Sequence, residues 1–180
     1  ASYATATLQA AVEGGADLLC LCDTNGGSMP WDIERIVGEV QAAFPNVRLG
    51  IHAHNDGGLA VANSLAAVRA GAVHVQGTMN GYGERCGNAD LCTIIPSLEL
   101  KMTRRALPEN NLRELTRTAR AVTSIANQVP DRHAPYVGLS AFAHKGGIHV
   151  AAMRRNILSY QHVDPALVGN ESRVVISELA

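Results

Sequence analysis

The sequence lacks an excess of charge of either sign, because 15 Lys and Arg residues nearly balance 16 Asp and Glu residues. Nothing in its charge therefore predicts binding to nucleic acid or to an anionic membrane surface. Cysteines are few (Cys20, Cys22, Cys86 and Cys92), and no two have the C-x-x-C spacing of many metal and redox sites. We expect reduced thiols in a cytoplasmic protein rather than a disulfide framework.

Long hydrophobic runs are also missing, although 47% of the 180 residues are hydrophobic. No stretch of about 18 apolar residues is present, so we expect no transmembrane helix, and no signal peptide is recognisable. The composition suits a soluble globular protein with a core of its own. The sequence opens without methionine and inside a helical pattern. A domain rarely starts in this way, so we expect a piece of a longer protein.

The first hundred residues alternate between apolar runs and amphipathic stretches. The apolar runs at 18–24, 47–54 and 73–79 are nearly continuous, as in parallel strands that are buried on both faces. Between them, 30–44 and 59–70 carry apolar residues at intervals of three and four, as helices do. This alternation predicts an α/β fold and leaves two architectures open, a doubly wound sheet or a (β/α) barrel.

Both architectures place functional groups at the carboxyl ends of the strands, and polar residues gather there in this sequence. His52 and His54 are the strongest signal, because residues two apart on a strand point to the same side of the sheet. Their imidazoles can then bind one ion, with Asn55 and Asp56 as hydrogen-bond partners that fix the tautomers. Two structural histidines that bond only to their neighbours are the alternative.

A glycine-rich loop spans residues 81–89 and leads toward a predicted helix. Alternating glycines let backbone amides approach a ligand, although such loops are common. Asn88 can either cap the helix or supply an amide oxygen to a metal. Glu84 and Arg85 can either contact a substrate or pair with each other. Cys86 is a possible nucleophile, but a structural cysteine is the preferred interpretation.

After this loop the alternation stops. We expect a helix over 88–101 that is broken or bent at Pro96, and a long helix over 112–127. A domain boundary is placed near residue 105, which gives domains of 1–105 and 106–180. Residues 140–149 contain His144 and His149, which suit either acid–base chemistry or a solvated connecting loop.

Three segments together resemble the family of citramalate, 2-isopropylmalate and homocitrate synthases. They are LCDTNGG, the stretch from GIHAHNDGG to GYGERCGNADL, and GLSAFAHKGGIHVAA with the sequence that follows it. The resemblance covers nearly the whole chain, and 141–149 together with Tyr160 look most like the citramalate branch. It implies a metal-dependent (β/α) barrel enzyme that condenses acetyl-CoA with a 2-oxo acid. Pyruvate is the expected 2-oxo acid, and isoleucine biosynthesis the expected role.

The resemblance also implies a role for individual residues. His52, His54 and Asn88 would bind a divalent ion such as Zn²⁺, Mn²⁺ or Mg²⁺. Thr24 would contact the 2-oxo acid carboxylate, and Glu84 and Arg85 would belong to the substrate-binding loop. His149 and Tyr160 would act as catalytic residues that reach the active site of a partner subunit, because the family is dimeric.

The chain departs from the family pattern at its start. It has no D-R-E motif, which supplies the aspartate metal ligand and the catalytic arginine, and no further catalytic glutamate. Its three strands would be the last three of eight, followed by a small, mostly helical linker subdomain. We therefore expect the 180 residues alone to be inactive. A 2-isopropylmalate or homocitrate synthase, a hydroxymethylglutaryl-CoA lyase-like enzyme that uses Cys86, and a non-enzymatic metal-binding module are the alternatives.

Overall fold

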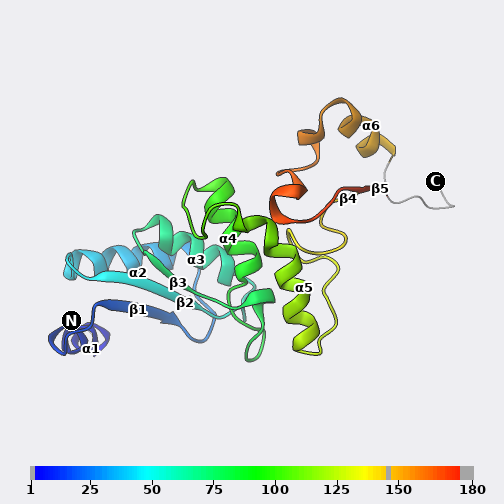
Figure 1. The fold of residues 1–180 in the computed structure, drawn as a ribbon. Coiled ribbons are helices and arrows are strands. Elements are labelled where there is room, and N and C mark those ends of the chain that lie inside the picture. Colours follow the sequence, from blue (N-terminus) through cyan, green and yellow to red (C-terminus); the bar gives the residue numbers. More distant parts are fainter. Residues whose placement is uncertain (1–2, 145–146, 175–180) are drawn as a thin grey trace. The chain divides into compact units, whose positions relative to one another are not determined.

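A computed structural model describes residues 3–144 and 147–174 of the chain. The chain divides into two units, Ala1–Ile94 and Ile95–Ala180. Each unit has buried hydrophobic residues of its own, and Figure 1 shows its helices and strands. The predicted boundary near residue 105 stays a prediction.

The first unit contains an open, parallel, three-stranded sheet in the order β1-β2-β3. Cys22 of β1 lies opposite His52 of β2, which in turn lies opposite Gln76 of β3. One helix connects each strand to the next, so the predicted alternation of strands and helices is confirmed. The elements are α1 (Tyr3–Glu13), β1 (Leu18–Asp23), α2 (Pro30–Ala43), β2 (Arg48–Ala53), α3 (Ala60–Arg69) and β3 (His74–Gln76).

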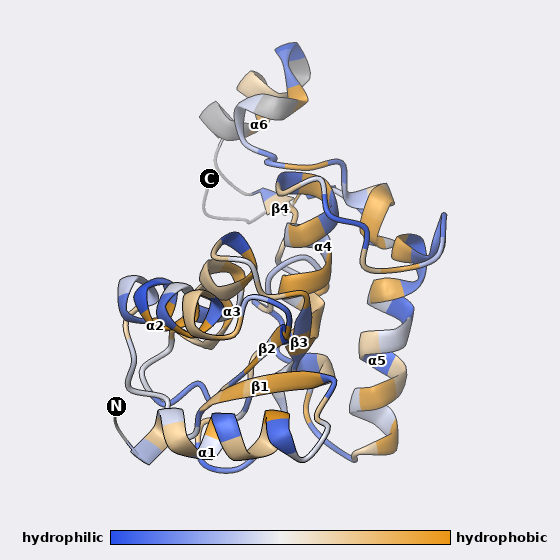
Figure 2. Ribbon diagram, turned by 90° about the vertical axis from the view of Figure 1, so that its left-hand side faces the viewer, coloured by the Kyte–Doolittle hydropathy of each residue, from blue (hydrophilic) through white to orange (hydrophobic). Residues whose placement is uncertain are grey.

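Hydrophobic residues from the strands and from α2 and α3 form the core of this unit. Leu49, Ile51 and Ala53 of β2 are at most 1% exposed, and the first two pack in one cluster with Ile33 and Val37 of α2. Because side chains alternate along a strand, His52 lies on the face of the sheet opposite these helices. Figure 2 shows β1 as hydrophobic over most of its length, as expected for a strand beside this core.

Local sequence explains where the connecting helices start and stop. Pro30 occupies the first turn of α2, where its missing N–H group costs nothing. Gly71 follows α3 with a φ of +119°, a backbone angle that glycine adopts without strain. Both features agree with the helix ends predicted from the sequence.

Two helices beyond β3 differ from the prediction. Helix α4 (Leu91–Lys101) starts three residues later than expected and is not broken at Pro96, whose ring is fully buried. A bend at this proline stays a prediction. Burial of the ring adds hydrophobic stabilisation to a turn that lacks the hydrogen bond proline cannot donate. The helix expected over 112–127 begins instead as the 3₁₀ turn η2 (Asn111–Glu114), and only α5 (Leu115–Ile125) is α-helical. Asn110, at a φ of +66°, reverses the chain just before it.

The second unit consists of short helices and strands. Its buried side chains include some from α5 and some from the residues around Val168. Thr116 of α5 donates a hydrogen bond of 2.6 Å from Oγ1 to the carbonyl of buried Val168. A two-stranded parallel ribbon pairs β4 with β5. The remaining elements are β4 (Ala143–His144), α6 (Gly147–Arg155), η3 (Ile157–Ser159), η4 (Pro165–Val168) and β5 (Arg173–Val174).

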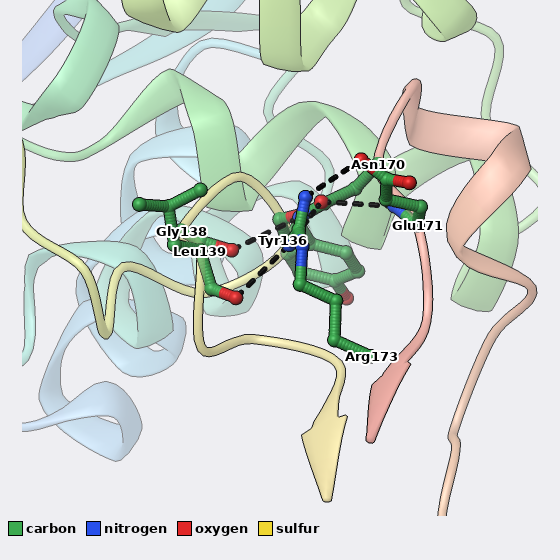
Figure 3. Close-up of polar contacts among 6 residues, drawn as sticks. All are labelled: Tyr136, Gly138, Leu139, Asn170, Glu171 and Arg173. Atoms are coloured by element: carbon green, nitrogen blue, oxygen red, sulfur yellow. Dashed lines mark hydrogen bonds and ion pairs between the residues drawn. The ribbon is translucent and has the colours of Figure 1, made fainter. Parts of the chain in front are cut away.

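Asn170 joins the two segments that lead into this ribbon (Figure 3). Its buried side-chain amide donates to the carbonyls of Tyr136 and Gly138, at 2.8 and 3.0 Å. Arg173 donates to the carbonyl of Leu139 at 3.0 Å. These bonds satisfy main-chain carbonyls in a stretch with little regular secondary structure. In the described part of the chain, no helix is long and apolar enough to cross a membrane.

Candidate functional site

The carboxyl ends of β2 and β3 are joined by the end of the glycine-rich loop. Ala89 donates from its N–H to the carbonyl of Ala53 at 3.0 Å, and its own carbonyl accepts from the N–H of Thr78 at 3.0 Å. Asn55 donates to the carbonyl of Gly87 at 2.9 Å. Residues 87–89 therefore lie between the two strand ends, and an isolated antiparallel bridge pairs His54 with Asn88.

The two histidines of the H-x-H motif turn toward each other. Their Nε2 atoms are 3.3 Å apart, and the ring planes meet at 63°. Both side chains are half-buried at the end of β2. The structure thus places His52 and His54 on one side of the sheet, as their spacing predicts.

Asn88 lies beside them with an unsatisfied oxygen. Its Oδ1 is buried without a hydrogen-bond partner, while its Nδ2 donates to the carbonyl of Tyr82 at 3.3 Å. Asn88 does not cap α4, because Asp90 does: the carboxylate of Asp90 accepts from the N–H of Cys92 at 2.9 Å. The amide oxygen of Asn88 is therefore available for another partner.

These three residues fit a divalent cation. Two nitrogens bound about 2.0–2.1 Å from one ion, at tetrahedral to octahedral angles, lie about 2.8–3.4 Å apart. The observed 3.3 Å between the Nε2 atoms is in this range. The buried, unpartnered oxygen of Asn88 suits a hard cation, because a cation satisfies it without a donor proton. The described residues contain no cluster of three or more His, Cys, Asp or Glu side chains that could hold a metal.

The sequence led us to expect that Asn55 and Asp56 orient the two imidazoles. In the structure neither side chain does so. The Oδ1 of Asn55 accepts from the N–H of Ala60 at the start of α3, at 3.1 Å. Asp56 binds Arg85 instead. The Nδ1 atom of His54 is buried and has no hydrogen-bond partner. This part of the prediction was wrong, because both side chains are already engaged by other groups.

Arg85 joins the loops that follow the three strands. Its Nε and Nη2 atoms contact the two carboxylate oxygens of Asp56 at 2.7 and 2.9 Å. Nη2 also donates to the carbonyl of Thr24 at 2.7 Å. Hydrogen bonding by this guanidinium keeps the pKa of the Asp56 carboxyl below its usual value. The ion-pair partner of Arg85 is thus Asp56, and not its neighbour Glu84, which is exposed.

Asp23, at the end of β1, is a buried polar residue that the sequence pattern did not single out. The carboxylate of Asp23, 8% exposed, accepts from Ser28 Oγ at 3.0 Å and from Asn63 Nδ2 at 3.4 Å. These bonds hold the first turn of the loop that carries Thr24. An aspartate at the end of a hydrophobic strand was the available signal, but its partner in α3 is 40 residues away.

Cys86 and Cys92 differ in their exposure to solvent. Cys86 is exposed in the glycine-rich loop. Cys92 is buried, and burial raises the pKa of its thiol to about 12. Cys92 is therefore protonated at neutral pH and does not suit a nucleophilic role.

The two remaining predicted site residues belong to the second unit. His149 lies in α6, but its side chain is outside the described part of the structure. Tyr160 follows η3 and is 45% exposed. Both residues are described only by their place in the second unit.

Two family models match the chain. The HMGL-like model matches residues 1–122, and the homocitrate synthase post-HMGL domain-like model matches residues 136–179. The first covers the whole three-stranded sheet with α4 and most of α5. The second covers the segment of short elements that follows.

Similar proteins agree with these models. The chain is 55% identical to an (R)-citramalate synthase of Synechocystis sp. and 35% identical to a 2-isopropylmalate synthase of Bacillus anthracis. The matches cover 99% and 94% of this chain, and 34% of each relative. The chain thus spans about a third of the length of the curated relatives it matches.

A solved structure shares the fold. An HMG-CoA lyase from Bacillus subtilis matches with a TM-score of 0.61 and 27% identity, over 70% of this chain and 44% of that one. The open parallel sheet and its helices are therefore part of an HMGL-like TIM-barrel fold, followed by a small domain. The family models, the arrangement of the strand ends and the shared fold agree. The chain belongs to the HMGL-like family, and a homocitrate synthase post-HMGL domain-like segment follows.

Proposed function

We propose that this chain is part of a citramalate synthase, which condenses acetyl-CoA with pyruvate and releases coenzyme A. One observation carries the proposal: two imidazoles face each other where parallel strands end, and a bridge to His54 brings in Asn88, whose buried amide oxygen has no donor. In a barrel this edge is where chemistry occurs. The high identity to (R)-citramalate synthases from several organisms favours pyruvate over other 2-oxo acids.

We propose further that the chain provides the last three strand–helix units of an eight-stranded barrel, over residues 1–105. A mostly helical subdomain over 106–180 would follow. Three parallel strands form an open sheet and cannot close a barrel alone. The full-length protein is thus the proposed active species, and the 180 residues by themselves are expected to be inactive.

His52, His54 and Asn88 are the proposed metal ligands of this site. HMGL-like family members typically use divalent metals, and a set of two nitrogens and one oxygen is compatible with Zn²⁺, Mn²⁺ or Mg²⁺. A divalent ion held there would polarise the ketone of the 2-oxo acid as a Lewis acid. The two imidazoles would have to be unprotonated at Nε2 to bind it.

Substrate contacts are assigned to the loops beside these ligands. Thr24, exposed at the end of β1, would bind the carboxylate of the 2-oxo acid. Glu84 and Arg85 would form part of the substrate-binding loop.

Proton transfer is assigned to the second unit. His149 would assist removal of a methyl proton from acetyl-CoA, with Tyr160 beside it. The resulting enolate would attack the ketone carbon of pyruvate, and water would then hydrolyse the thioester to free coenzyme A. By the family resemblance these two residues would act in the partner subunit of a homodimer. Free thiols at all four cysteines fit the proposed cytoplasmic location.

The test is an assay of the full-length protein loaded with a divalent metal. Release of coenzyme A is followed with a thiol reagent in the presence of acetyl-CoA and pyruvate, 2-oxoisovalerate or 2-oxoglutarate. We expect turnover with pyruvate, a product with the mass of citramalate, and a loss of at least about 100-fold in His52→Ala. Arg69→Gln, a change on the outer helices, is the control and should keep activity. Turnover with another 2-oxo acid but not with pyruvate would overturn the substrate assignment.

A further inference from the structure

The guanidinium of Arg85 is the point where all three strand-end loops meet. Thr24 follows β1, Asp56 follows β2, and Arg85 lies in the loop after β3. Arg85 is 61 residues from Thr24 and 29 from Asp56, and it contacts both within 2.9 Å. A single side chain thus sets the spacing between the proposed substrate contact and the end of the histidine strand.

The contact uses the full geometry of arginine. Nε and Nη2 bind the two carboxylate oxygens side by side, which fixes the plane of the guanidinium. The second hydrogen of Nη2 is then directed at the carbonyl of Thr24. A lysine ammonium has no such planar fork and cannot hold both partners in this geometry.

The backbone is shaped to bring these groups together. Arg85 has a φ of +58°, a left-handed conformation that is unfavourable for a residue with a side chain. Gly26 has a φ of +66°, and a Cβ there would lie 2.7 Å from an Asp56 carboxylate oxygen. The N–H of Gly57 donates to the carbonyl of Gly26 at 3.0 Å. The first two loops are therefore packed closely where Asp56 receives Arg85.

The side chains of Arg85 and Asp56 are 41% and 25% exposed, so water weakens this ion pair even though its bidentate geometry is favourable. An unfavourable backbone angle beside a candidate site points to a functional constraint. The hydrogen bond from Arg85 to the Thr24 carbonyl indicates that the constraint acts on the loop that carries Thr24.

We propose that Asp56 and Arg85 are positioning residues. Their ion pair holds the main chain of Thr24, so that the side chain of Thr24 binds the carboxylate of the 2-oxo acid. The inference rests on the proposed function, and it names Asp56 as a residue that shapes substrate affinity without touching substrate. Asp56 orients Arg85, and Arg85 holds Thr24.

Asp56→Asn in the full-length enzyme tests the proposal, because asparagine has the same shape but neither the charge nor the second acceptor oxygen. We expect KM for pyruvate to rise about tenfold. The kcat, the KM for acetyl-CoA and the affinity for added Zn²⁺ should stay close to wild type. Arg69→Gln is the matched control: it removes an ion pair with Glu34 that also joins distant segments, on helices away from the strand ends. Its KM for pyruvate should not change.

A double-mutant cycle identifies the route of the effect. If Asp56 acts through Thr24, Asp56→Asn should add little to the KM of Thr24→Val, whereas independent roles would multiply the two effects. Arg85→Lys is the milder variant for use if Asp56→Asn does not fold, and it should also raise KM for pyruvate. A lower melting temperature with an unchanged KM would overturn the proposal. Absence of pyruvate turnover in the wild type would instead remove the proposed function.

Discussion

Gly83 controls the position of the Asn88 amide, and alanine at this position should damage the candidate metal site. A Cβ on Gly83 would overlap the Nδ2 atom of Asn88 and lie 3.0 Å from its Cγ. The φ of Gly83 is not in the left-handed region, so the alanine backbone itself is not strained there. The new methyl group therefore acts on the amide.

The size of the effect follows from the displacement required. Real Cβ contacts are rarely closer than 3.4 Å, so the amide must move by about 1 Å. The hydrogen bond from Nδ2 to the Tyr82 carbonyl is lost, at a net cost of about 0.5–1.5 kcal/mol. A ligand displaced this far should weaken metal binding about 10- to 100-fold, and a misplaced reacting group can lower turnover by about 100-fold.

The measurement is a titration of the metal-free, full-length protein with Zn²⁺ or Mn²⁺ against a competing chelator. Gly38→Ala is the control, because a Cβ on this helical glycine meets nothing within 4 Å. We expect Gly38→Ala to bind metal like the wild type and to gain about 0.5–1 kcal/mol of stability. Gly83→Ala should lose affinity even where its melting temperature is nearly unchanged.

The double variant Gly83→Ala/Asn88→Ala separates the explanations. If the methyl group acts through Asn88, the double variant should bind metal no more weakly than Asn88→Ala alone. Equal metal affinities of Gly83→Ala and wild type would refute the reasoning: either the loop moves instead of the amide, or Asn88 is not a ligand.

Three further outcomes are expected. Iodoacetamide should alkylate exposed Cys86 in the native protein but reach Cys92 only after unfolding, because burial protects this thiol and raises its pKa to about 12; peptide mass spectrometry would detect a contrary order. Thr116→Val should cost about 1–3 kcal/mol in urea unfolding, because the Val168 carbonyl loses its buried donor, and an unchanged midpoint would contradict this. A chelator should lower the melting temperature of the metal-loaded wild type but not that of His52→Ala, and equal shifts would argue against this ligand.

The alternation of strands and helices could be predicted because each segment encodes it locally. The run at 18–24 is apolar up to Cys22 and forms β1, and the periodic stretch at 30–44 forms α2. The face occupied by His52 could also be predicted, since the two-residue period of a strand allows one arrangement. The third strand is shorter than its apolar run, because the chain turns into η1 (Met79–Gly81), where Asn80 adopts a φ of +62°.

Contacts between distant loops could not be predicted in this way. Asp56 lies two residues after His54, and its sequence position suggests a partner for that histidine. Its partner is Arg85, 29 residues on, because the loop after β3 returns to the end of β2. The same return brings Asn88 beside His54 and leaves the cap of α4 to Asp90.

The amino-acid sequence by itself determined that strands and helices alternate in the first unit, and that His52 and His54 share one side of a strand. These properties depend on neighbouring residues and on the period of each element. The tertiary structure alone decided which loops meet at the strand ends, that Arg85 holds Asp56 and Thr24, and that the oxygen of Asn88 is left without a donor. The reason is physical: a side chain's partners depend on where the chain returns in space, and no local pattern encodes that.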